Sequence, residues 1–85
     1  MLFLLENWSV KSDRHSNELI QFGKYVKKLR EEKGFSQEDL ANESDLSLSQ
    51  ISRIERGVIS SSLSQLISIS NSLKITLSQL FDFQR

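Results

Sequence analysis

The chain has 85 residues, no cysteine and no net charge, because eleven lysine and arginine residues balance eleven aspartate and glutamate residues. This length allows one small domain, whose core must form without disulfide bonds. No apolar run is long enough for a membrane-spanning helix, and no basic residue precedes the N-terminal LFLL run as in a secretory signal. We therefore expect a cytoplasmic protein with no membrane partner.

Residues 1–17 form an apolar N-terminal arm that precedes the first predicted helix. The arm is too short to bury its own large side chains, which are Leu2, Phe3, Leu4, Leu5 and Trp8. It needs either a groove on its own domain or a second subunit, and we favour contact with a second subunit. The lysine-rich helix that follows is predicted to begin near Asn17 or Glu18.

Residues 35–57 carry the pattern of two short helices joined by a tight turn. Apolar side chains recur at helical spacing on both sides of the turn, so that two stripes can share one core. These side chains are Leu40, Ala41, Leu46, Ile51 and Ile54. Ser36 and Ser47 begin the two helices, and Asp39 and Gln50 follow three residues later, as in a capping box. The segment predicts a helix-turn-helix.

The second of these helices has a polar outer face. Successive helical residues are 100° apart, so an inner side of Ile51, Ile54 and Glu55 places Ser49 and Arg53 nearly opposite. Ser52 and Arg56 flank that pair. Short hydroxyls around one long guanidinium can enter the major groove of DNA, where arginine pairs with N7 and O6 of guanine. The alternative interpretation is an ordinary solvated helix surface.

Two further helices follow, because Ser62 with Gln65 and Thr76 with Gln79 repeat the capping pattern. Two apolar stripes are expected to close the core, the first formed by Leu63, Leu66, Ile67 and Leu73 and the second by Leu77, Leu80 and Phe81. The loop at 57–61 offers backbone N–H groups and hydroxyls to a phosphate. The pattern predicts an all-α domain over residues 18–83.

The residues that catalysis or metal binding requires are scarce. His15 is the only histidine, and neither a glycine-rich phosphate loop nor a paired carboxylate site occurs. Asp13 and His15 lie in the predicted arm, where nothing would hold a catalytic triad in place. We expect no enzymatic activity, no metal site, no cofactor and no small-molecule effector.

The neutral overall charge conceals an uneven distribution. Residues 24–33 carry five basic and two acidic side chains, for a charge of +3, whereas residues 38–45 carry four acidic ones, for −4. A surface with so few basic residues neutralises few phosphates, so a monomer would bind DNA weakly and pairing would strengthen binding. We therefore expect a homodimer on double-stranded DNA. The lysine-rich face can also be read as an ordinary solvated one.

Residues 22–81 resemble the Xre or phage-repressor (Cro-like) family of helix-turn-helix domains. The likeness is carried by the segments FGKYVKKLREEKGFSQEDLA, ISRIERG and LKITLSQLF. It implies a compact five-helix phage-repressor-like DNA-binding domain, here with an N-terminal extension. It also implies a transcriptional regulator, similar to small stand-alone controller proteins, that reads a palindromic operator with a recognition helix at about 47–56.

The resemblance assigns roles to particular residues. The positions that read bases correspond to Ser47, Leu48, Ser49 and Arg53, and the position that holds a phosphate corresponds to Gln37. Ser52, Arg56 and Ser60 are the further phosphate contacts that the outer face and the following loop suggest. The family's structural ion pair corresponds to Arg30 and Glu55.

Two positions depart from the family pattern. Asp45 stands in the turn where relatives carry glycine, and aspartate adopts a positive φ at a strain of about 1 kcal/mol. Leu48 stands where many relatives carry a polar base reader, so the operator need not resemble theirs. A protein-interaction module, such as an antitoxin that binds DNA secondarily, is the alternative function, because the apolar arm offers a surface for a partner protein.

Overall fold

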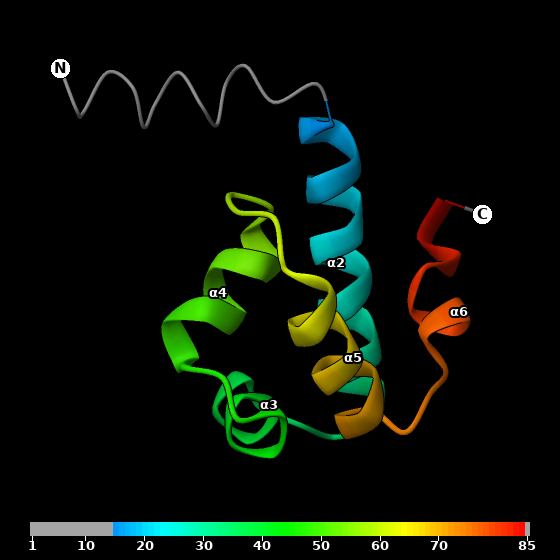
Figure 1. Cartoon of the computed structure of the whole chain (residues 1–85). Helices are drawn as coiled ribbons and strands as arrows, with labels where there is room; N and C mark the ends of the chain where they lie inside the picture. The colour runs from blue at the N-terminus through cyan, green and yellow to red at the C-terminus, as the bar shows by residue number, and fades with distance from the viewer. Residues whose placement is uncertain (1–14, 85) are drawn as a thin grey trace, which may run out of the picture.

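A computed structural model describes residues 15–84 and shows five α-helices followed by a short 3-10 helix in that range (Figure 1). The elements are α2 (Ser16–Glu32), α3 (Gln37–Ser44), α4 (Leu48–Arg56), α5 (Leu63–Ser72), α6 (Leu77–Leu80) and η1 (Asp82–Gln84). No strand occurs between residues 15 and 84, which confirms the predicted all-α, five-helix class. α2 begins slightly earlier than predicted, and residues 1–14 of the predicted arm lie outside the described residues.

α3, α4, α5 and α6 all begin at the predicted capping boxes. In each one a serine or threonine hydroxyl accepts from the backbone N–H three residues later, and the side chain of that later residue accepts in return. At α4, the two hydrogen bonds between Ser47 and Gln50 measure 2.8 and 3.0 Å. At α3, the backbone hydrogen bond from Ser36 lowers the pKa of Asp39. Helix starts are therefore local properties of this sequence.

The turn between α3 and α4 has the backbone conformation that the family comparison anticipated for Asp45. Asp45 ends α3 in the left-handed region, with φ of 57°, and its N–H donates to backbone carbonyls of the last helical turn. Leu46 then donates its N–H to the Ala41 carbonyl at 3.0 Å. Aspartate thus makes this turn without glycine, at the small cost in strain that the left-handed region imposes.

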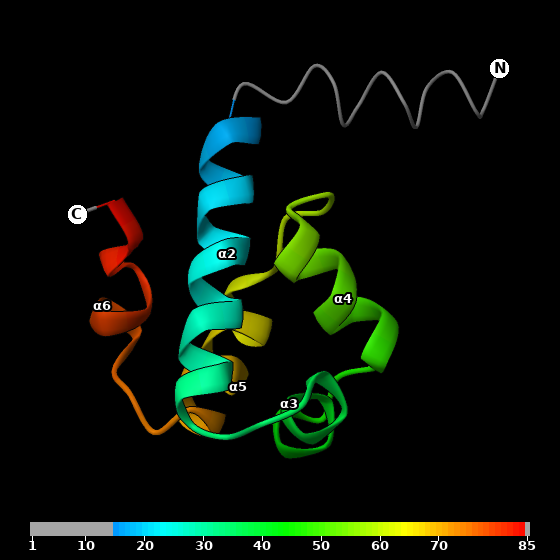
Figure 2. The same cartoon turned by 180° about the vertical axis from the view of Figure 1, so that it is seen from behind.

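The core lies around α2, which has α4 on one side and α6 on the other in both views (Figures 1 and 2). Its fully buried side chains come from every helix: Val26, Leu40, Ile51, Ile69, Leu73 and Leu80. The Tyr25 hydroxyl donates to the backbone carbonyl of Gln79 at 2.9 Å and fastens α6 to α2. One continuous core therefore holds both the helix pair α3–α4 and the C-terminal elements.

The prediction that Leu63, Ile67 and Phe81 close this core is wrong. Their side chains are 60%, 43% and 45% exposed, whereas Ile69 is fully buried. Ile69 and Leu73, four residues apart, form the inward stripe of α5 and its C-terminal end. Leu63 and Ile67, also four residues apart, form another stripe about 120° away around the helix. Because a ten-residue helix presents one stripe to the core, the second stripe is left on the surface.

Close contact between α2 and α4 depends on Gly23. A Cβ atom at Gly23 would overlap the backbone carbonyl oxygens of Ile54 and Glu55. The two helix backbones can approach this closely only because residue 23 has no side chain. Gly57 at the end of α4 plays a similar part, since its φ is 72° and a Cβ there would meet the backbone of Ile20.

The expected ion pair between Arg30 and Glu55 is present and buried. The Arg30 Nε atom donates to Glu55 Oε2 at 2.6 Å, and Nη2 donates to Oε1 at 3.0 Å. The two side chains are only 9% and 3% exposed. The Arg30 Nη1 atom also donates to the Phe35 carbonyl at 2.8 Å. The hydrogen bond with Glu55 raises the pKa of Arg30, so the guanidinium stays charged.

Arg30→Ala is expected to destabilise the fold by about 3–5 kcal/mol, because it leaves the Glu55 carboxylate buried without its counterion. Urea unfolding followed by circular dichroism measures the change. Lys28→Ala, on the exposed face of the same helix, is the matched control and should change stability by no more than about 0.5 kcal/mol. Equal effects of the two substitutions would contradict a structural role for the ion pair.

Candidate nucleic-acid interface

One side of α4 is buried against the rest of the protein, and the opposite side is exposed to solvent. Ile51, Ile54 and Glu55 are at most 7% exposed, as the helical spacing predicted for the inner side. Ser49 and Arg53 are exposed on the opposite side. The helix therefore contributes to the core through one face while the other face remains free to meet a ligand.

The structure places the four predicted base readers together on the outer side of α4 and at its start. Ser47, Leu48 and Ser49 are exposed at the first turn, and Arg53 is exposed one turn before the end. The surface formed by these four residues is called the reading face below.

Two of the predicted phosphate contacts flank the reading face. Ser52 is half-buried, and Arg56 is exposed and donates from Nε to the Ser52 carbonyl at 3.4 Å. Ser60, a third, is exposed in the loop between α4 and α5. These three side chains lie along α4 or just beyond its end. A DNA backbone that passes the last turn of α4 could contact all three.

Gln37 has a partner that sequence reasoning missed. Its side-chain Nε2 donates to Glu55 Oε1 at 3.0 Å, the same oxygen that accepts from Arg30 Nη2. The residues are eighteen positions apart, and no spacing rule links them. The amide nitrogen carries a second hydrogen, which leaves a donor for a phosphate oxygen. Gln37 therefore lies beside the last turn of α4, whereas Ser47, Leu48 and Ser49 lie at its first turn.

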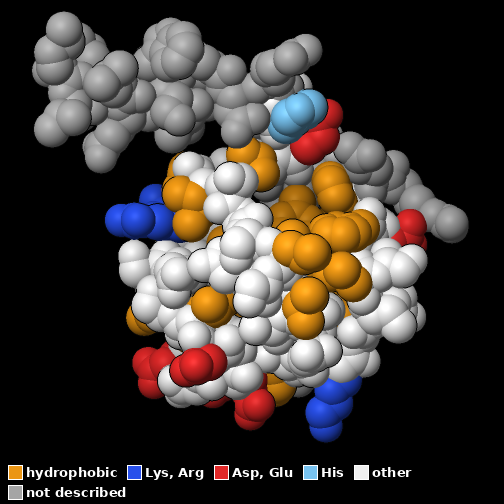
Figure 3. Space-filling view, in the orientation of Figure 1, with side chains coloured by type: hydrophobic (Ala, Val, Ile, Leu, Met, Phe, Trp, Pro, Cys, Tyr) orange, Lys and Arg blue, Asp and Glu red, His pale blue; other side chains and the backbone are white. Residues whose placement is uncertain are grey.

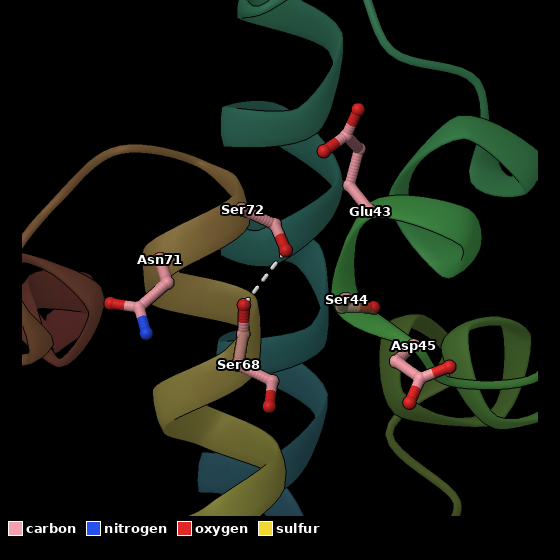
Figure 4. Close-up of a pocket in the computed structure, with 6 residues that line it drawn as sticks. All are labelled: Glu43, Ser44, Asp45, Ser68, Asn71 and Ser72. Carbon is pink, nitrogen blue, oxygen red and sulfur yellow. Dashed lines mark hydrogen bonds between the residues drawn. The ribbon is translucent and has the colours of Figure 1, made fainter.

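A concave region lies between the end of α3 and α5 (Figure 4). This pocket of about 310 Å³ is lined by Glu43, Ser44, Asp45, Ser68, Asn71 and Ser72. Ligand pockets are mostly apolar with a few polar groups, and this lining contains no apolar residue. Its two carboxylates, Glu43 and Asp45, would repel a phosphate group.

The part of the chain from residue 15 to residue 84 contains no group of three or more histidine, cysteine, aspartate or glutamate residues that could hold a metal ion. No helix in that part is both long and apolar enough to span a bilayer.

Comparison with known proteins identifies the family. The helix-turn-helix family model matches residues 26–80, which is more than half of the chain. The control protein C.MunI of Mycoplasma sp is 49% identical over 63 residues, a match that covers 73% of this chain and 85% of the relative.

Solved structures agree with that family. The controller protein C.AhdI of Aeromonas hydrophila, described as a restriction-modification controller protein, aligns with a TM-score of 0.74 and 36% identity, over 75% of this chain and 97% of that one. The restriction-modification controller protein C.Esp1396I aligns with a TM-score of 0.69 and 36% identity, over 75% and 83% of the two chains. The chain belongs to the helix-turn-helix family of the Xre type, a family of sequence-specific DNA-binding transcriptional regulators.

Proposed function

We propose that the chain regulates transcription by inserting α4 into the major groove and reading bases with Ser47, Leu48, Ser49 and Arg53. The observation that carries this proposal is the division of α4 into a sealed inner side and an exposed reading face with one free guanidinium. Phosphate contacts from Gln37, Ser52, Arg56 and Ser60 set the orientation of the helix on the duplex. Two of the similar proteins are described as restriction-modification controllers. This description supports a role in controlling restriction-modification genes, which the chain would carry out in the cytoplasm.

The distribution of charge favours an orientation with α3 pointing partly away from DNA. Glu38, Asp39, Glu43 and Asp45 are all exposed, and acidic side chains gather at the α3 end of the molecule (Figure 3). Lys24, Lys27 and Lys28 are exposed on α2, and Lys33 is exposed directly after it. Because only a few basic side chains reach phosphates in one subunit, two subunits are needed for firm binding.

The surface of the domain supports pairing into a homodimer. Apolar side chains gather over α5 and towards α6 (Figure 3). We define the apolar patch as Leu63 and Ile67 of α5 together with Phe81, which directly follows α6; these side chains are 60%, 43% and 45% exposed. A two-fold contact through this patch would bury it on both copies at once. Two recognition helices about 34 Å apart would then read the half-sites of a palindrome.

In this proposal, the part of the N-terminal arm that precedes α2 contributes apolar side chains to the same dimer contact. Leu2, Phe3, Leu4, Leu5 and Trp8 supply side chains that an isolated segment cannot bury. The arm joins the domain at the start of α2, and seven residues separate Trp8 from the first helical residue, Ser16. An extended segment of that length spans about 23 Å, which is enough to reach a neighbouring subunit.

Arg53→Ala is expected to weaken binding to a duplex selected from a random library by about 1–3 kcal/mol and to relax preference at one base position. Arg56→Ala is the matched comparison, because loss of a phosphate contact should weaken binding about equally on all sequences. Mobility-shift titrations on the selected duplex and its single-base variants measure both effects. An Arg53→Ala loss that is uniform across sequences would contradict base reading by Arg53.

Ile67→Asp should convert the free protein from dimer to monomer, since it places a charge in the apolar patch. Sedimentation velocity without DNA measures the mass. Leu48→Asp is the matched control, because Leu48 is similarly exposed at 48% but lies outside the patch. A dimer that survives Ile67→Asp, or a wild-type chain that sediments as a monomer, would rule out pairing through this patch.

Deletion of residues 1–10 is expected to shift the same equilibrium towards monomer by removing most of the arm's apolar side chains. The shift should appear as a higher dissociation constant in sedimentation at several protein concentrations, with the circular dichroism spectrum of the helical domain retained. An unchanged dissociation constant would exclude the arm from the dimer contact.

A further inference from the structure

Leu48 is the only large apolar side chain on the reading face. Its side chain is 48% exposed, while the other apolar side chains of α4, Ile51 and Ile54, are at most 2% exposed. Leu48 also lies outside the buried core cluster and the set of apolar side chains that pack against it. Its neighbours on the reading face, Ser47, Ser49 and Arg53, are all polar. The fold gives this leucine no partner within the core.

The backbone holds Leu48 in a defined position. Leu48 is the first residue of α4, directly after the capping residue Ser47. The Ser47 hydroxyl accepts from the Gln50 N–H, and the Gln50 side chain accepts from the Ser47 N–H, so the first turn is closed on both sides. Because this turn is ordered, the Leu48 side chain has a defined position and can discriminate the shape and polarity of the base edge that it contacts.

The major groove offers few apolar groups that a leucine could meet. The base edges there carry hydrogen-bond donors and acceptors, and the one apolar substituent is the C5 methyl group of thymine. A leucine in contact with one of these donors or acceptors would exclude water from that polar group. The group would lose its hydrogen bond to water and gain none from the leucine, which is unfavourable. Contact with the methyl group instead buries apolar surface on both sides.

From these observations we infer that Leu48 determines specificity by contacting the C5 methyl group of a thymine at one fixed position in each half-site. The inference rests on the proposed insertion of α4 into the major groove. It deepens that proposal by naming the base feature that this chain selects. Leu48 thereby selects by an apolar contact and Arg53 by hydrogen bonds, so the two side chains discriminate different base pairs.

The experiment uses the full chain and the duplex that it selects from a random library. A series of duplexes is then synthesised in which one thymine at a time is replaced by uracil, which removes only the methyl group and keeps base pairing. Wild-type binding should weaken about fourfold at one position and its symmetry mate, the effect of losing one buried methyl group. In Leu48→Ala, thymine and uracil at that position should bind equally well.

Asn42→Ala is the control, because Asn42 is exposed on α3 and lies outside the residues assigned to DNA contacts. It should retain the fourfold preference for thymine, and circular dichroism should show that both variants are as helical as the wild type. A wild-type protein indifferent to uracil at every position, or a thymine preference that persists in Leu48→Ala, would overturn the inference alone. Failure to select any preferred sequence would overturn the proposed function and this inference with it.

Discussion

The carboxylate of Glu55 is a junction for three segments of the protein. It accepts two hydrogen bonds from Arg30 of α2 and one from Gln37 at the start of α3, while Arg30 also reaches the Phe35 carbonyl between those helices. A buried ion pair adds little net stability compared with apolar packing, but removal of one partner is costly because the other charge stays buried. The network therefore enforces one arrangement of α2, α3 and α4.

In that arrangement, the outer side of α4 has no structural role. The capping box at Ser47 closes the first turn, Glu55 anchors the last turn, and Gly23 lets α2 pack directly against the helix backbone. Because all of these constraints act on the ends or the inner side of α4, residues such as Ser49 and Arg53 can vary without disturbing the core. Such a separation allows a family to change its DNA sequence preference while it keeps one fold.

Local patterns were sufficient to predict much of the fold and the candidate site. The helix starts follow from capping residues that contact the backbone only three positions away, as with Ser47 and Gln50. The inner side of α4 follows from helical periodicity, because Ile51, Ile54 and Glu55 must share one face. The positive φ of Asp45 was anticipated because family members carry glycine there. Each of these features depends on short-range geometry or on a recurring motif, so one sequence is enough to indicate it.

The sequence by itself determined where α3, α4, α5 and α6 begin and which face of α4 carries the polar side chains. The tertiary structure alone decided which stripe of α5 is buried, leaving Leu63 and Ile67 exposed while Ile69 is covered. It also decided that Gln37 shares an oxygen of Glu55 with Arg30, and that Gly23 touches the backbone of α4. These outcomes depend on the distances and angles between helices, which are set by the packing of the whole core and leave no periodic signal along the chain.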